Sequence, residues 1–302
     1  VVYAATTATL IETDADGSIE AIRFTRRDGS TGRAKGRLFI IAAHAIETPR
    51  LLLASISERT PKGVANSSDM VGRNLMDHPT QLSWASTIEP VWPYRGPLST
   101  SGIENLSDGP FRSDRGAFRI EIGNDGHSWP TGAPVSTATE LVKQGLGGEE
   151  LNAALRAATS RHIRMASLVE QLPDPENRVT LHESERDRYG VLLPKISYRL
   201  DDYAKAGLKA ATKAHQEIFE KLGTTDIHHS PSFAGAGHII GTAKMGNDPK
   251  NSVVDSELRS HDHPNLFIVG SATFPTSATA NPTLTIAALS LRTAQAILKQ
   301  LS

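Results

Sequence analysis

Apolar residues near the C-terminus recur at helical spacing. From residue 284 they follow one another at three- and four-residue steps, at Leu284, Ala287, Ala288, Leu291, Ala294, Leu298 and Leu301. This period predicts an amphipathic helix whose apolar face is part of a core. Asn281 and Pro282 stand where the helix would begin, because asparagine is a favoured N-cap and proline suits the first turn.

The residues before this helix read as a short apolar strand, Ile268–Val269, followed by a loop rich in small residues. The free N–H groups and the positive dipole end of the helix would then face the end of a strand, where they suit an anion or an electron-rich cofactor edge. The alternative is a last helix that only closes an α/β sheet.

Other segments predict further elements. Residues 9–13 and 19–24 alternate around Asp16-Gly17, which is typical of a β-hairpin. An apolar strand from residue 38 leads into a helix with Thr48 as N-cap and Pro49 in the first turn. Residues 164–171, 177–181 and 194–198 read as strands of an antiparallel sheet, and 201–222 as an amphipathic helix closed by Gly223.

The region from about residue 80 to 150 is different, because its glycine and proline residues break any long period. It reads as loop-rich sequence, of the kind that contacts a substrate or covers a site as a lid. A solvated connector or a surface for partner docking remains an equal alternative for any single residue there.

Several motifs occur in a fixed order along the chain. They are Leu38–Leu53, Val71–Pro79, Gly237–Gly246, Asn251–Asp255, His263–Phe267 and the stretch from Ile268 to Leu289. In this order and spacing the chain resembles the C-terminal part of the glucose–methanol–choline (GMC) oxidoreductases, and most of all their bacterial FAD-dependent sugar and polyol dehydrogenases, with pyranose oxidases as near relatives. Ordered matches that span residues 38 to 289 are specific, whereas any one of them alone would be weak.

The resemblance implies an α/β chain, α+β overall, with portions of a Rossmann-like FAD-binding domain around a substrate domain that has a mostly antiparallel sheet and flanking helices. The expected division is 1–70 and 251–302 for the FAD-binding parts and 71–250 for the substrate domain. The family's G-x-G-x-x-G turn is missing, because Gly235–Gly241 has its third glycine one place late and follows no buried strand. We therefore expect the N-terminal dinucleotide-binding segment on the same or a separate chain.

The activity that the resemblance implies is oxidation of a CH–OH group of a sugar or polyol, with FAD as cofactor and flavin N5 as hydride acceptor. Histidine suits proton removal from a hydroxyl near neutral pH. His238 matches the family's catalytic histidine, and Asn281 matches the position of its histidine or asparagine partner. Residues expected to border the cofactor are His44, Asn74, Gly270, Ser271, Asn281, Pro282 and Thr283.

Two of these positions depart from the family pattern. His44 stands where relatives commonly have glycine, and Ser271 where many have an acidic residue. Asn281 has two expected roles that compete for one side chain, capping the last helix and holding the substrate oxygen. His78 is interpreted as a structural or supporting residue and not as a base.

Composition excludes some classes and leaves others open. The formal net charge of −1 suggests neither nucleic acid nor acidic membrane as a partner, and no apolar run has the length of a membrane span. With no cysteine, disulfides and thiolate catalysis are excluded. Periplasm and cytoplasm both remain possible locations.

Three alternatives to a dehydrogenase stay open. One is an oxidase of the same family that uses oxygen, and another is a non-catalytic C-terminal fragment or subunit. A third, a metal enzyme, would use ligands from His228, His229, His238, Asp255, His261, Asp262 and His263, but their spacing fits no standard set; we expect no metal. Relatives of the suggested kind often work with a cytochrome or other electron-acceptor subunit and a small chaperone-like subunit.

Overall fold

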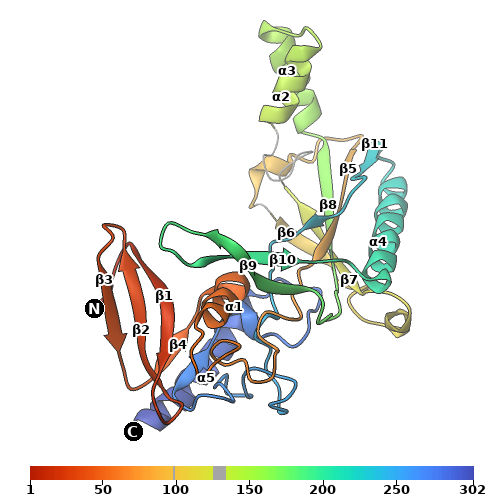
Figure 1. Cartoon of the computed structure of the whole chain (residues 1–302). Coiled ribbons are helices and arrows are strands. Elements are labelled where there is room, and N and C mark those ends of the chain that lie inside the picture. Colours follow the sequence, from red (N-terminus) through yellow and green to blue (C-terminus); the bar gives the residue numbers. More distant parts are fainter. Residues whose placement is uncertain (98, 125–133) are drawn as a thin grey trace.

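A computed structural model describes residues 1–97, 99–124 and 134–302 (Figure 1). Its strands are β1 (Thr6–Thr13), β2 (Ile19–Arg26), β3 (Thr31–Lys35), β4 (Phe39–Ile41), β5 (Pro79–Ser86), β6 (Ser99–Ile103), β7 (Phe118–Gly123), β8 (His162–Val169), β9 (Arg178–Arg186), β10 (Leu192–Ser197), β11 (Thr225–His229), β12 (Ala234–Gly235) and β13 (Leu266–Ile268). Its helices are α1 (His44–Ala54), α2 (Val135–Lys143), α3 (Gly148–Thr159), α4 (Asp202–Lys221) and α5 (Thr283–Leu301), with 3-10 turns η1 (Pro93–Arg95), η2 (Pro110–Ser113) and η3 (Ser271–Thr273).

One end of the molecule brings together the two ends of the chain. β4 and β13 pair in parallel, so that two segments more than two hundred residues apart lie side by side, and α1 and α5 pack near them (Figure 1). The antiparallel sheet β1–β2–β3 stands beside this pair. Asn265 joins the two sheets, because its side chain accepts from the N–H and donates to the carbonyl of Ile19, at 2.8 and 2.9 Å.

The other end is built on an antiparallel sheet of order β11–β5–β8–β7–β6, with β12 beside β5 (Figure 1). Side chains alternate across a sheet, so each strand shows one set of residues to each face. α4 covers one face, where Leu208, Ala211 and Phe219 are buried against Phe118 and Met165. The opposite face of β5, β7 and β8 is left for the site described below.

The strands and helix predicted at 9–24, 164–171, 177–198 and 201–222 are present, and Asp201 caps α4 by accepting from the N–H of Ala204. The loop-rich interpretation of residues 80–150 was wrong. Outside residues 98 and 125–133, this region contains β5, β6 and β7 of the largest sheet and the helical hairpin α2–α3. Glycine and proline in the connections hid strands that are only five to eight residues long.

The start of α1 was also predicted wrongly. The helix begins at His44 and not after Thr48, so Pro49 lies inside it. The His44 ring explains the earlier start, because its Nδ1 accepts a hydrogen bond from the N–H of Ile46 at 3.1 Å and so partners one of the free donors of the first turn. His44 has φ of 48°, a left-handed conformation that glycine adopts without strain.

Pro49 leaves one carbonyl of α1 without its helical hydrogen bond, and Thr242 supplies the missing donor. A proline inside a helix lacks the N–H that would bond to the carbonyl four residues earlier, here that of Ala45. The hydroxyl of Thr242, which is fully buried, donates to this oxygen at 2.7 Å. A side chain from the opposite end of the sequence therefore completes the hydrogen bonding of α1.

Replacing Thr242 by valine should destabilise the protein through this carbonyl. Valine keeps the shape and leaves a buried acceptor without its partner, which costs about 1–3 kcal/mol. Guanidinium unfolding followed by circular dichroism measures the loss. In a Pro49→Ala background the new N–H can bond to the Ala45 oxygen, so Thr242→Val should cost clearly less there. An equal cost in both backgrounds would contradict this explanation.

α5 differs from its prediction in two ways. It begins at Thr283 with Pro282 at the cap position, and the Asn281 side chain makes no capping bond to its first turn. The apolar face expected in a core is exposed in the described chain, with Leu284 at 83%, Leu291 at 71% and Leu298 at 66% exposure. The periodicity was correct, but no described segment covers these leucines. None of the described helices is long and apolar enough to cross a bilayer.

Candidate active site

Backbone hydrogen bonds bring three distant segments together beside α5. Met76 and Ile240 exchange N–H···O bonds of 3.0 and 2.9 Å, and Gly241 N–H donates to Ser271 O at 3.1 Å. Gly72 N–H donates to Thr242 O at 2.7 Å. The segments at 72–78, 238–245 and 271–282 thereby lie side by side at the junction of the two ends of the molecule.

His238 and Asn281, predicted as a catalytic pair, lie close together. The Asn281 side-chain nitrogen is 3.3 Å from Nε2 of His238. Arg119 of β7 contacts the other atom of this amide, with Nη1 3.5 Å from Asn281 Oδ1. Because Asn281 does not cap α5, its amide is available to groups at the His238 ring.

A second histidine stands behind His238. His78 Nδ1 lies 2.9 Å from His238 Nδ1, with the two rings edge to face at 82°. The other nitrogen of His78 lies 2.8 Å from the carbonyl oxygen of Ala278. His78 is 1% exposed, which agrees with a supporting position, and its direct contact with His238 was not foreseen from the sequence.

The Asp77 carboxylate fixes the backbone of both histidines. Oδ1 accepts from the N–H of His78 at 2.7 Å and from the N–H of His238 at 2.8 Å, and Oδ2 accepts from Gly237 at 3.2 Å. A Cβ at Gly235 would come within 2.6 Å of Oδ2, so glycine is needed for this close approach. Asp77 is a site residue that sequence reasoning missed.

Burial sets the protonation of both rings. It lowers the pKa of His238 below its usual 6.5, while Asp77 and Glu121 act in the opposite direction. Burial and the neighbouring charge of His238 lower the pKa of His78 to about 4. Near neutral pH both imidazoles are therefore uncharged, and a neutral imidazole can take up a proton.

A cavity of about 110 Å³ opens beside His238 and Asn281. Its wall is the free face of the large sheet, including Thr80, Leu82, Glu121, Arg164, Ala166 and Leu168. Glu121 and Arg119, both on β7, form an ion pair with 3.2 Å between Oε1 and Nη2. Neither was predicted, although the alternation of apolar and polar residues from Phe118 to Ile122 is the signal of a half-buried strand.

A different cavity of about 330 Å³ lies on the other side of Asn281. Its walls are mostly apolar and include His78, Ile240, Met245, Phe274, Pro282 and Leu289. It borders the first turn of α5, whose free N–H groups suit the electron-rich edge of a flavin. Mainly apolar walls with a few polar groups are typical of a cofactor site.

Asn74 gives a further test of whether the site fits FAD. Its side chain is 3% exposed, and its Nδ2 has no hydrogen-bond partner among the described residues. A buried amide left unpaired costs about 1–3 kcal/mol, so such a donor fits a site where a ligand supplies the acceptor. Asn74 also has φ of 62°, and a Cβ on Gly241 would come within 2.2 Å of its carbonyl oxygen.

Three further predicted cofactor residues lie at one edge of the β4–β13 pair, whereas Pro282 and Thr283 lie at the start of α5. His44 follows β4, and Gly270 and Ser271 follow β13, so all three stand at the carboxyl ends of parallel strands. Ligands of α/β folds bind at such edges. Gly270 has φ of 95°, and a Cβ there would meet nothing within 4 Å, so the space beside it is open.

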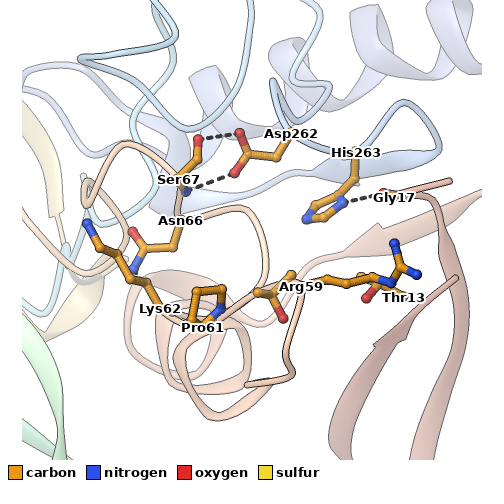
Figure 2. Close-up of a pocket in the computed structure, with 11 residues that line it drawn as sticks. Thr13, Gly17, Arg59, Pro61, Lys62, Asn66, Ser67, Asp262 and His263 are labelled. Atoms are coloured by element: carbon orange, nitrogen blue, oxygen red, sulfur yellow. Dashed lines mark hydrogen bonds between the residues drawn. The ribbon is translucent and has the colours of Figure 1, made fainter. Parts of the chain in front are cut away.

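Another cavity, of about 460 Å³, lies away from this edge (Figure 2). Several of its polar groups bond to one another or to nearby backbone: Asp262 accepts from the hydroxyl and N–H of Ser67, and His263 donates to the Gly17 carbonyl and accepts from the Ala65 N–H. These bonds join the β1–β2 turn to the segment before β13.

The candidate metal ligands do not converge. In the described parts of the chain, no three histidine, aspartate or glutamate side chains are placed to share a metal ion. His229 bonds to Ser83 at 2.7 Å, and His261 bonds to Ser252 at 2.9 Å, each within its own part of the fold.

Known proteins match this chain along nearly its whole length. The family model described as GMC oxidoreductase matches residues 173–290. The fructose dehydrogenase large subunit of Gluconobacter japonicus is 40% identical over 96% of this chain and 52% of its own length. Paromamine 6'-oxidase of Streptomyces fradiae is 30% identical over 94% of this chain and 49% of its own. The chain thus spans about half the length of these relatives.

Among solved structures, a formate oxidase of Aspergillus oryzae RIB40 matches 98% of this chain and 60% of its own with a TM-score of 0.71 at 15% identity. This likeness confirms the predicted mixed α/β fold. Motif order, family model and relatives agree with one another, and the chain belongs to the GMC oxidoreductase family.

Proposed function

We propose that this chain forms the catalytic part of an FAD-dependent dehydrogenase that oxidises a CH–OH group of a sugar or polyol. The observation that supports this most is the pairing of His238 Nε2 with the Asn281 amide at 3.3 Å, where two cavities meet. The smaller cavity would hold the substrate and the larger one would hold the flavin ring.

Each residue has a proposed part in the reaction. Oxidation of an alcohol removes a proton from the hydroxyl and a hydride from the carbon. His238, uncharged near neutral pH, takes the hydroxyl proton on Nε2, and the Asn281 amide holds the same oxygen in place. FAD, when bound, supplies the acceptor for the hydride. The residues that would hold FAD are Asn74, His44, Gly270, Ser271, Pro282 and Thr283.

The polar wall of the small cavity supports a substrate with several hydroxyls. A carboxylate can accept several hydrogen bonds, so Glu121, which pairs with Arg119 through Oε1, keeps acceptor capacity for the hydroxyl hydrogens of a substrate. A site built around such groups discriminates against molecules without the matching hydroxyl, because the carboxylate would then be left unpaired.

We further propose that residues 1–70 and 251–302 complete an FAD-binding domain around a substrate domain of residues 71–250. The exposed leucines of α5 would pack on the N-terminal dinucleotide-binding segment, on the same or a separate chain. One relative is named as a large subunit, which supports an assembly with an electron-acceptor subunit such as a cytochrome.

An anaerobic absorption spectrum tests this proposal on the protein purified with every chain that co-purifies. We expect a flavin spectrum that is bleached by at least one sugar or polyol and by no simple alcohol of similar size. A dehydrogenase should then stay bleached when air is admitted and recover on addition of an artificial acceptor. Bound flavin that no polyhydroxylated compound bleaches would refute the proposal.

A further inference from the structure

The hydrogen bond between His78 and His238 has one proton, and the surrounding contacts show which of the two rings donates it. Two ring nitrogens 2.9 Å apart form a hydrogen bond only if one donates and the other accepts. Which ring nitrogen of a histidine has the proton is decided by the bond that the other nitrogen makes. The outer bond of His78 therefore decides the direction of the inner one.

That outer bond leaves only one arrangement. The partner of His78 Nε2 is the carbonyl oxygen of Ala278, which can only accept, so the Nε2 of His78 is protonated. His78 is buried and uncharged near neutral pH, so it has one N–H and its Nδ1 is a bare acceptor. The shared proton consequently belongs to Nδ1 of His238.

This tautomer determines the state of the other ring nitrogen of His238, Nε2. With its proton on Nδ1, neutral His238 has its lone pair on Nε2, the nitrogen beside the Asn281 amide. The other tautomer would place an N–H where a base is needed. We propose that His78 is a positioning residue that holds His238 in the Nδ1–H tautomer and so directs its basic nitrogen to the substrate cavity.

This role rests on the proposed function, and the surroundings of the pair support it. Asp77 accepts from the backbone N–H of both residues at 2.7 and 2.8 Å, which fixes the backbone from which each side chain extends. Neither ring can turn without breaking the bond of 2.9 Å between them. The other charged groups that act on His238 are Glu121 and Arg119 of β7, which oppose one another. When Nε2 takes the hydroxyl proton, the charged His238 ring still donates Nδ1–H to His78, so the bond survives the reaction.

Nuclear magnetic resonance of the flavin-loaded protein, with nitrogen-15 in histidine, tests the tautomer directly. In the wild type, Nδ1 of His238 should have the shift of a protonated ring nitrogen and Nε2 that of a bare one. A His238 found with a bare Nδ1 would overturn the proposal without any variant. The His238 signals are assigned by their loss in His238→Ala.

Two variants of His78 distinguish the effect of its hydrogen-bond acceptor from the effect of filling the space. His78→Asn keeps an oxygen near the position of Nδ1 and should keep the tautomer, whereas His78→Phe fills the space without an acceptor and should move much of the His238 population to Nε2–H. With Phe the kcat should fall roughly 10- to 100-fold with little change in KM, while Asn stays within a few-fold of wild type. An unchanged tautomer in the Phe variant would also refute the role.

The two readouts keep this inference apart from the proposed function. The expected tautomer in a protein that oxidises no CH–OH compound would leave the His78 inference standing and refute the function. Normal oxidation with a bare Nδ1 on His238 would do the reverse.

Discussion

His238→Ala should slow bleaching of the flavin by sugar or polyol about 10²- to 10⁴-fold, which is the usual contribution of a general base. The flavin itself should stay bound. His238 lines the cavity of about 110 Å³ and is not among the residues that line the cavity of about 330 Å³, where we place the flavin ring. Stopped-flow absorption under anaerobic conditions measures the rate, and the flavin content after gel filtration measures retention.

A matched control and a rescue sharpen this test. His182→Ala, at a partly exposed position of β9 that lines neither of these two cavities, should bleach at the wild-type rate. Free imidazole added to His238→Ala should restore part of the rate, because the truncated side chain leaves room next to the substrate cavity. Wild-type bleaching by His238→Ala would show that another group removes the proton.

The pH dependence follows from the same residue. Burial holds the pKa of His238 below 6.5, so the ring is uncharged at neutral pH and becomes protonated only in more acidic solution. A base must be unprotonated, so the bleaching rate should be constant at neutral pH and fall as the pH decreases through this pKa. The acidic fall should disappear in His238→Ala. A wild-type rate that rises on acidification would contradict the assignment.

The sequence was sufficient for elements with a strong local pattern. α4 has a polar N-cap and a regular apolar face, and the β1–β2 hairpin has a turn of aspartate and glycine, so local preference and tertiary structure agree there. α1 and α5 were placed correctly but started at the wrong residues. In α1 the His44 ring bonds to the N–H of Ile46, and Thr242, from far along the chain, compensates for Pro49. In α5 the Asn281 amide lies at the His238 ring and does not cap the helix.

The two central residues of the candidate site were expected from the motifs, and the residues that support them were not. His238 and Asn281 follow from the motifs, and the structure brings them together although they lie 43 residues apart. Asp77 and His78 act through hydrogen bonds to a segment about 160 residues away, so the residues next to them in the sequence give no signal of this contact. The orientation of the two rings depends on the Ala278 carbonyl, which has no side-chain signal at all.

Gly241→Ala should destabilise the protein by about 3 kcal/mol or more, since two costs coincide at this buried glycine. Its φ is 102°, and the new Cβ would stand 2.2 Å from the carbonyl oxygen of Asn74. Neither segment can move aside easily, because the bonds between Met76 and Ile240 and between Gly72 and Thr242 hold them at 2.7–3.0 Å. Displacing Asn74 should also reduce the amount of flavin retained.

Gly190→Ala is the control that isolates the close contact from the backbone conformation. Gly190, in the turn between β9 and β10, has a similar positive φ of 80°, and its Cβ would meet nothing within 4 Å. It should lose only the roughly 1 kcal/mol of a left-handed alanine and retain all its flavin. Denaturant unfolding of both variants gives the two costs. Equal losses would mean that the 72–76 and 240–245 segments can separate freely, and Asn74 would then not be held in place for the FAD contact that we propose.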